Sequence, residues 1–381
     1  MKKLQFAMVG GGNGALIGDI HRIGAQFDDL AELKAGCFSR HWDKNLEAGE
    51  KWGVEPGRIY PDYHTMLEEE AKRTGEDRLD FVVVATPNNT HYEIVKDIIA
   101  HGFHIVCDKP VTFTSRESEE LKALAQEKDL LFGVSYSYAH YAILEQAKKM
   151  IADGVLGKIH TIAAEYPQEW VGLNTALRGK DGLTWRVDPA ICGPSGVIAD
   201  IGTHVEYLIS KVTGLKPVRV LARLRSIPDY VPVESDAQVL IDYDNGAAGI
   251  FWTSFAMVGK SCCMKVRIYG DKGGMEWNAH DFMELRVDIA GQPTQIWSAN
   301  YDYCDPQARK SCRLPKGMPE AFHSLFANFY RGYCSHLLSR KEGKDERPFP
   351  YSDIDDGIQG LKFIEACLKS QEDGNVFEKL H

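Results

Sequence analysis

Apolar positions in the first third of the chain fall into short continuous runs that alternate with helix-like segments. The runs end in glycine, proline or polar residues, and they are too short to be helices. Continuous apolar runs separated by helices are typical of parallel strands that are covered on both faces. The predicted strands are Leu4–Val9, Leu33–Phe38, Asp80–Ala85, Phe103–Cys107 and Leu130–Ser135. We therefore expect a doubly wound α/β domain over residues 1–136.

The pattern changes after a helix predicted at 141–153. Strand-like runs then follow one another, most of them separated by short turns such as Asp244-Asn245-Gly246. The predicted strands cover 158–165, 217–225, 236–243, 246–254, 263–269, 274–278 and 284–289. They indicate an α+β domain over 137–381, built on a large, mainly antiparallel sheet with one open face. Ser352 or Asp353 is the expected N-cap of a last helix, which could also pack on the first domain.

Composition narrows the class of protein. A formal net charge of −10 over 381 residues argues against a nucleic-acid partner. No apolar run approaches the roughly 20 residues that span a membrane, and the run after the N-terminal lysines stops at glycines. We expect a cytoplasmic protein without membrane contact. The nine cysteines form no C-x-x-C pair, and Cys262 and Cys263 are interpreted as packing residues in a strand.

A glycine loop follows the first strand and precedes a helix, which is the context of a dinucleotide-binding motif. Gly10 suits the tight turn, and Gly12 allows a pyrophosphate to approach the backbone at the helix N-terminus. The third motif position is open between Ala15, which completes G-x-G-x-x-A, and Gly18. The predicted cofactor contacts in this loop are Gly10, Gly12, Asn13 and Ala15.

The end of the second predicted strand leaves the choice between NAD and NADP open. An acid at this point would bind the ribose 2′-hydroxyl, whereas the chain has Ser39 and Arg40. Arg40 could pair with a 2′-phosphate or stack on adenine. Both residues are predicted to contact the cofactor.

Two further strands end in polar loops that also belong at the ligand-binding edge of the sheet. The third strand leads into Thr86, Pro87, Asn88 and His91, and the fourth into Asp108-Lys109-Pro110. Proline restricts the backbone of the residue before it, so Lys109 is presented on a stiff corner. Taken alone, this lysine could equally be a solvated residue at a strand end.

The motifs G-x-G after the first strand, A-T-P-N-x-x-H at 85–91 and C-D-K-P at 107–110 together resemble the Gfo/Idh/MocA oxidoreductase family. The resemblance implies a Rossmann domain that binds NAD or NADP, with Thr86, Pro87, Asn88, His91 and Asp108 among its cofactor contacts. It also implies that Lys109 helps to bind substrate and assists proton transfer. Asp108 stands where the family's E-K-P motif has glutamate.

Asp200 and His204 lie four residues apart in a predicted helix over 197–211, so they share one face. An acid and an imidazole together can move a proton near neutral pH, although such pairs also occur as ordinary helix contacts. The family's D-x-x-x-H motif matches both positions. It implies that His204 is the acid or base acting on a substrate hydroxyl and that Asp200 orients the reacting group. A metal site including Glu206 is the less favoured interpretation, because no other ligand spacing is present.

Aromatic and charged residues near these motifs suggest a sugar site. Rings stack on sugars, and Arg or Asp can hold two hydroxyls. The predicted substrate contacts are Tyr136, Trp185, Arg186 and Asp188. The segments 313–323 and 349–357 resemble the sugar- and glycoside-oxidising, levoglucosan dehydrogenase-like branch of the family. This resemblance implies a dehydrogenase acting on a secondary hydroxyl of a sugar, glycoside or cyclitol, in a homodimer or homotetramer formed through the C-terminal sheet. A redox glycosidase that retains its NAD and a non-catalytic sugar or dinucleotide sensor are the alternatives.

Overall fold

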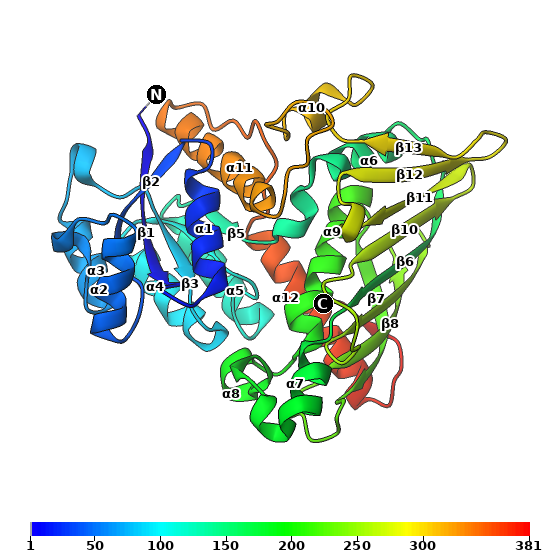
Figure 1. Cartoon of the computed structure of the whole chain (residues 1–381), viewed down its shortest axis with the longest axis horizontal. Helices are drawn as coiled ribbons and strands as arrows, with labels where there is room; N and C mark the ends of the chain where they lie inside the picture. Colours follow the sequence, from blue (N-terminus) through cyan, green and yellow to red (C-terminus); the bar gives the residue numbers. More distant parts are fainter. Residues whose placement is uncertain (1) are drawn as a thin grey trace. The chain divides into compact units, whose positions relative to one another are not determined.

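The computed structural model describes residues 2–381 and is shown in Figure 1. The chain divides into two compact units, each of which is formed by two separate stretches of sequence. The first unit contains the residues up to Ser137 together with Ala321–Ile358. The second unit contains Tyr138–Glu320 and Gln359–His381.

The first unit is a parallel sheet of five strands in the order β2-β1-β3-β4-β5. Its strands are β1 Leu4–Gly10, β2 Ala31–Cys37, β3 Phe81–Ala85, β4 His104–Cys107 and β5 Phe132–Val134. Its helices are α1 Leu16–Gln26, α2 Trp42–Lys51, α3 Tyr63–Ala71, α4 His91–Ala100, α5 Ser115–Glu127 and α11 His323–Lys341. Every residue of β3 is buried, as expected for a strand covered on both faces. The predicted doubly wound Rossmann sheet is confirmed.

Helix α11 comes from the C-terminal part of the sequence but packs against α1 at the start of the chain (Figure 1). Gly24 of α1 allows this close packing, because a Cβ there would lie 2.6 Å from the Cβ of Phe326. The buried His21 ring contacts the Tyr330 hydroxyl at 2.7 Å through Nδ1. Arg331 donates to both carboxylate oxygens of Asp28, at 2.8 and 2.9 Å. The first unit therefore depends on residues that are distant in sequence.

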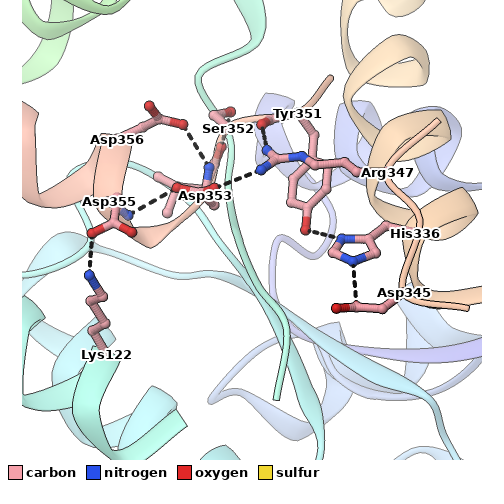
Figure 2. A network of polar contacts seen from close by, with 10 residues as sticks. Lys122, His336, Asp345, Arg347, Tyr351, Ser352, Asp353, Asp355 and Asp356 are labelled. Carbon is pink, nitrogen blue, oxygen red and sulfur yellow. Dashed lines mark hydrogen bonds and ion pairs between the residues drawn. The ribbon is translucent and has the colours of Figure 1, made fainter. Parts of the chain in front are cut away.

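A polar network joins the segment after α11 to the edge strand β5 (Figure 2). The amide of Val134 donates to the carbonyl of Ser352 at 2.9 Å, and the Ser352 hydroxyl donates to the carbonyl of Val134. Arg347 holds the neighbouring carboxylate of Asp353 at 3.0 Å. This segment satisfies backbone groups that an edge strand would otherwise expose.

The same segment begins helix α12, Ile354–Glu372. The Asp353 carboxylate accepts from the amide of Asp355, and the Asp356 carboxylate accepts from the amide of Asp353 (Figure 2). The Asp353 side chain thus caps the first turn of α12, so the prediction of Asp353 as N-cap is confirmed. The Ser352 side chain bonds β5 instead.

The second unit is built on a sheet of nine strands in the order β13-β12-β11-β10-β6-β9-β8-β7-β14. Its strands are β6 Ile159–Pro167, β7 Pro217–Arg225, β8 Asp236–Tyr243, β9 Ala248–Ser254, β10 Lys265–Gly270, β11 Gly273–Asn278, β12 Glu284–Ile289, β13 Gln295–Ser298 and β14 Glu378–Lys379. Its helices are α6 Ala142–Ala152, α7 Trp170–Arg178, α8 Pro189–Cys192, α9 Thr203–Thr213, α10 Pro306–Arg309 and the later part of α12. Only β6 and β9 pair in parallel, so the expectation of a mainly antiparallel sheet is confirmed.

Side chains on β8 and β9 alternate between the core and an open face. Val239 and Ile241 are buried, whereas Leu240 is 44% and Ile250 is 54% exposed. The predicted open face is therefore present. Its use in a homodimer or homotetramer stays a prediction.

Two local expectations are wrong. Strand β10 begins at Lys265, and Cys262 lies before it in an exposed loop with a φ of +51°, so the adjacent cysteines are not strand packing residues. The helix predicted from Val197 begins instead with a π-helical turn, Ile198–Gly202, which leads into α9. Among residues 2–381, no helix is both long and apolar enough to span a membrane.

Candidate active site

The glycine loop between β1 and α1 has no room for side chains at its two motif positions. A Cβ on Gly10, whose φ is +82°, would lie 2.6 Å from the Ala85 carbonyl oxygen. A Cβ on Gly12 would lie 2.7 Å from the Phe38 carbonyl oxygen, to which the Gly12 amide donates. The loop thus lies tightly against the ends of β3 and β2. A bare backbone of this kind before a helix N-terminus fits the pyrophosphate of a dinucleotide.

The third glycine position is Gly18. A Cβ on Gly18 would lie 1.8 Å from the Gly11 carbonyl oxygen, so only glycine permits this packing of α1 against the loop. Ala15 is instead the extended residue before α1, with a φ of −97° and a ψ of 106°. The close contact between helix and loop that the motif requires is therefore made three residues later than in G-x-G-x-x-A.

The end of β2 carries the two residues expected near the adenosine ribose. The Ser39 hydroxyl accepts from the amide of His41 at 3.1 Å, and Arg40 is exposed. The buried side chain of Asn45 fixes this corner by accepting from the Phe38 amide at 2.7 Å and donating to the Tyr60 carbonyl at 2.6 Å. The Asn13 side-chain oxygen accepts from Lys51 on α2. Arg40 is thus the charged residue available for a 2′-phosphate at this strand end.

Thr86, Pro87, Asn88 and His91 follow β3, as predicted, but His91 has a different role from the one expected. Its ring is fully buried, and its two nitrogens contact the carbonyl oxygens of Thr86 and Pro110, each at 2.9 Å. His91 therefore ties the loop after β3 to the loop after β4 and has no ring nitrogen left for a cofactor. The Thr90 hydroxyl bonds back to Thr86 and Pro87 and does not cap α4.

Asp108 and Lys109 follow β4 at the carboxyl edge of the sheet. One Asp108 carboxylate oxygen accepts from the Lys109 amide at 3.0 Å and from the Ser135 hydroxyl at 2.5 Å. The Asp108 amide donates to the Val84 carbonyl of β3. Asp108 therefore fixes the backbone from which the Lys109 side chain extends, and the peptide between Lys109 and Pro110 is cis.

In the second unit, Asp200 lies in the π-helical turn and His204 in the first turn of α9. The His204 ring is 8% exposed and meets the Tyr138 ring edge to face, with centroids 4.9 Å apart. Tyr138 is uncharged near neutral pH, because burial raises the pKa of its phenol to about 12. Its oxygen also accepts from the buried Tyr166 hydroxyl at 2.8 Å. His204 thus lies against a neutral aromatic ring.

Trp185 and Arg186 lie near the same turn; of the other two predicted substrate contacts, Asp188 is exposed and Tyr136 is buried. The Arg186 guanidinium lies 4.8 Å from the centre of the Trp185 ring and 4.0 Å from the Asp200 carboxylate. Trp185 is 38% exposed and has a ring available for stacking, but Tyr136 is only 1% exposed. The Asp188 carboxylate accepts from the Ala190 amide and caps α8. Tyr136 and Asp188 therefore serve packing and capping in the structure.

Two supporting residues escaped the sequence analysis. Ser135 binds the Asp108 carboxylate across two strands, and Glu234 binds the segment that leads into the Asp200 turn. Neither belongs to a local motif, because Ser135 lies 27 positions from its partner and Glu234 lies 36 or more positions from its partners. In the part of the chain from 2 to 381, no group of three His, Cys, Asp or Glu side chains could hold a metal ion.

Comparisons with known proteins agree with this arrangement. Residues 4–136 match the model of an oxidoreductase family with an NAD-binding Rossmann fold, and residues 144–276 match the GFO/IDH/MocA C-terminal domain. The chain is 36% identical over 381 residues to the uncharacterized oxidoreductase YfiI of Bacillus subtilis, covering 99% of this chain and 96% of YfiI.

Solved structures are similar over almost the whole chain. An inositol dehydrogenase homologue from Azotobacter vinelandii complexed with NAD+ superimposes with a TM-score of 0.93 and 35% identity, covering 99% of this chain and 97% of that one. Its complex with NADH and myo-inositol gives a TM-score of 0.90 and 34% identity, covering 99% and 98%. The levoglucosan dehydrogenase of Pseudarthrobacter phenanthrenivorans is 27% identical over 231 residues, covering 55% of this chain and 58% of that enzyme. The likeness to the levoglucosan branch is therefore distant.

Proposed function

This chain belongs to the Gfo/Idh/MocA family of oxidoreductases with an NAD-binding Rossmann domain, and from that premise we propose that it oxidises a secondary hydroxyl of a cyclitol or sugar. We place cyclitols first among the substrates. The reason is that a relative of 34% identity over nearly the full chain has been crystallised with NADH and myo-inositol. Glycosides and anhydrosugars come second, because the relative that acts on levoglucosan matches only about half of the chain.

The observation that carries the proposal is the surrounding of His204. Its imidazole lies beside the neutral Tyr138 ring, on the same short segment as Asp200. An imidazole can accept a hydroxyl proton near neutral pH and return it in the reverse reaction. Asp200, with Arg186 at 4.0 Å, can accept a hydrogen bond from the same or a neighbouring hydroxyl.

We assign Lys109 the role of stabilising negative charge on the hydroxyl oxygen as its proton leaves. Its ammonium is a compact charge with three donors, and its backbone is fixed by the Asp108 carboxylate. Trp185 would stack on the apolar face of the ring, while Arg186 would bind ring hydroxyls. These residues orient the substrate, which accounts for a large share of the rate that enzymes of this kind achieve.

NAD fits the first unit because the glycine loop leaves bare backbone where a pyrophosphate binds. Gly10, Gly12 and Gly18 each lie where any Cβ would collide with backbone. When bound, the nicotinamide ring accepts the hydride that leaves the substrate carbon. The exposed Arg40 also allows a 2′-phosphate, so use of NADP is part of the proposal.

The test is the growth of reduced-nicotinamide absorbance when the purified protein meets NAD or NADP with a panel of inositols, hexoses, glucosides and anhydrosugars. Reduction with inositols at the highest kcat/KM is expected. Reduction with glucosides alone would overturn the ranking of substrates. Release of free sugar from a glycoside without net cofactor reduction would replace the proposal with the redox glycosidase. Thermal stabilisation by a sugar without any turnover would favour the sensor.

A further inference from the structure

Glu234, in the segment before β8, gathers several hydrogen bonds from one short stretch of the second unit. One of its carboxylate oxygens accepts from the Ser195 hydroxyl at 2.6 Å, the Gly196 amide at 2.9 Å and the Ile198 amide at 3.2 Å. Its carbonyl oxygen accepts from the Val197 amide at 3.0 Å. Four donors of the consecutive residues 195–198 therefore bind a single residue from another part of the chain.

Three of these donors are backbone amides at the start of a helix, where amides lack an intrahelical partner. The π-helical turn begins at Ile198, and the Asp200 amide donates to the Gly196 carbonyl at 3.0 Å. Ser195 also accepts from the Ala199 amide at 3.3 Å, so its hydroxyl links the carboxylate to the turn. The turn that carries Asp200 thus begins on a stretch of backbone held by Glu234.

The contact is close and buried. Glu234 is only 8% exposed, and a Cβ on Gly196 would lie 2.4 Å from the Glu234 carbonyl oxygen. Burial raises the pKa of the carboxyl, while its hydrogen bonds with Ser195, Gly196 and Ile198 oppose that shift. A buried carboxyl without these partners would be unfavourable, so the two segments depend on each other.

We infer that Glu234 is a positioning residue that sets the location of Asp200 and His204 by holding the start of the π-helical turn. The inference rests on the proposed roles of Asp200 and His204. It adds that their placement depends on a carboxylate more than thirty positions away in the sequence. Glu234 is not assigned any contact with substrate or cofactor.

The first test is hydrogen exchange measured by mass spectrometry on the whole protein, which requires no knowledge of the substrate. In Glu234→Ala, amides of the peptide covering 196–205 should exchange at least about fivefold faster than in the wild type. In Glu234→Gln, exchange should stay near the wild-type rate, because the amide oxygen can accept the same three hydrogen bonds. Unchanged exchange in Glu234→Ala would overturn the inference.

Glu320 provides a matched control in the same unit. It is 7% exposed, and its carboxylate accepts from the backbone amides of Arg313 and Leu314. Glu320→Ala should speed exchange around 313–320 and leave 196–205 unchanged. If Glu234→Ala does not fold, Ser195→Ala replaces it and should speed exchange of 196–205 at least about threefold. An unchanged rate in Ser195→Ala would then contradict the inference.

The second test separates positioning from general stability. Glu234→Ala should lower kcat at least about tenfold while the Kd for NADH stays within about twofold, because the glycine loop belongs to the first unit. Glu234→Gln should restore most of kcat. Loss of thermal stability with kcat intact would show a structural role alone. If the wild type reduced no cofactor with any substrate, the proposed function would fail, whereas the exchange experiment would still decide the role of Glu234.

Discussion

Gly18 and Ala15, both near the start of α1, differ in whether the structure leaves room for a side chain. Gly18 faces the Gly11 carbonyl at a distance that excludes any side chain, whereas Ala15 lies outside the helix in an extended conformation. Gly18→Ala should therefore weaken NADH binding at least about tenfold, because the loop must shift away from the pyrophosphate. Ala15→Ser should change the affinity less than about threefold. Fluorescence titration with NADH measures both, and the reverse order would assign the motif to Ala15.

The proposed role of Lys109 also belongs to the scale of one side chain. Lys109→Ala removes the ammonium together with its alkyl chain and should lower kcat by roughly 100-fold or more, since charge at the reacting oxygen is lost. The Kd for NADH should change little. Lys128→Ala is the control, because this exposed lysine of the same unit contacts only the Ala100 carbonyl. Steady-state kinetics of both variants test this role. Wild-type turnover in Lys109→Ala would show that Lys109 takes no part in the mechanism.

Sequence patterns located residues that follow strands or lie within a family motif, but not the partners of those residues. Lys109 was predictable because β4 ends at Cys107, two residues before it. The burial of Tyr136 and the two carbonyl contacts of His91 were not, since they depend on loops brought together by the sheet. For the same reason, no local signal distinguished Gly18 from Ala15.

At the scale of elements, the Asp353 side chain stabilises the first turn of α12. Asp353→Ala should lower the free energy of unfolding by about 1 kcal/mol, because the cap and the contact with Arg347 are lost together. Asp355→Ala is the comparison: its carboxylate is 66% exposed and pairs with Lys122, so a change below about 0.5 kcal/mol is expected. Urea unfolding of both variants measures the difference. Equal losses would show that the Asp353 cap adds nothing specific.

Strand β4 should make the first unit sensitive to acid. Burial, followed by the charge of Arg340, lowers the pKa of His104 from 6.5 to about 4. The neutral ring accepts from the Leu131 amide at 2.9 Å. Below pH 6.5 the unfolded chain takes up a proton that the folded protein resists, so stability falls until about pH 4 and then levels off.

The loss attributable to His104 should reach up to about 3 kcal/mol across this range. His104→Asn keeps an acceptor for the Leu131 amide but cannot titrate. Unfolding free energies of wild type and variant, measured in urea at several pH values, should therefore diverge as the pH falls. Parallel curves would mean that His104 does not govern the acid sensitivity.

Elements with a continuous or alternating apolar pattern were predicted close to their observed bounds. The parallel strands of the first unit and the long strands β7 and β8 are examples. The π-helical turn at Ile198 was not predicted, because its i to i+5 hydrogen bond, from Thr203 to Ile198, leaves no trace in the periodicity. Helices α7 and α8 were missed because they are short and lie among glycines.

At the scale of the whole molecule, the first unit cannot be cut from the chain as its first 137 residues. Without Ala321–Ile358, α1 would lose Phe326 and Tyr330, and β5 would lose the backbone contact with Ser352. No local sequence pattern indicates this return, because nothing within residues 323–341 identifies α1 as the partner of α11.

Residues up to 137 alone should therefore fail to unfold cooperatively or to bind NADH. Joined to 321–358 through a long flexible linker, they should recover both properties. The control is the joined chain with Phe326→Asp, which places a charge against Gly24 and should lose them again. Calorimetry measures the cooperativity of unfolding, and titration measures NADH binding. NADH binding by residues up to 137 alone would show that α11 is dispensable.

Because α11 lies late in the sequence, the first unit can be completed only late in synthesis of the chain. A ribosome that has made Ser137 must add 221 more residues, from 138 to 358, before the first unit holds all of its parts. At about 5–20 residues per second this takes roughly 10–45 s. Throughout that interval the nascent Rossmann sheet lacks the cover of α11, and the β5 edge lacks its neighbour. The unfinished first unit therefore exposes apolar surface and a strand edge until residues 321–358 have been made.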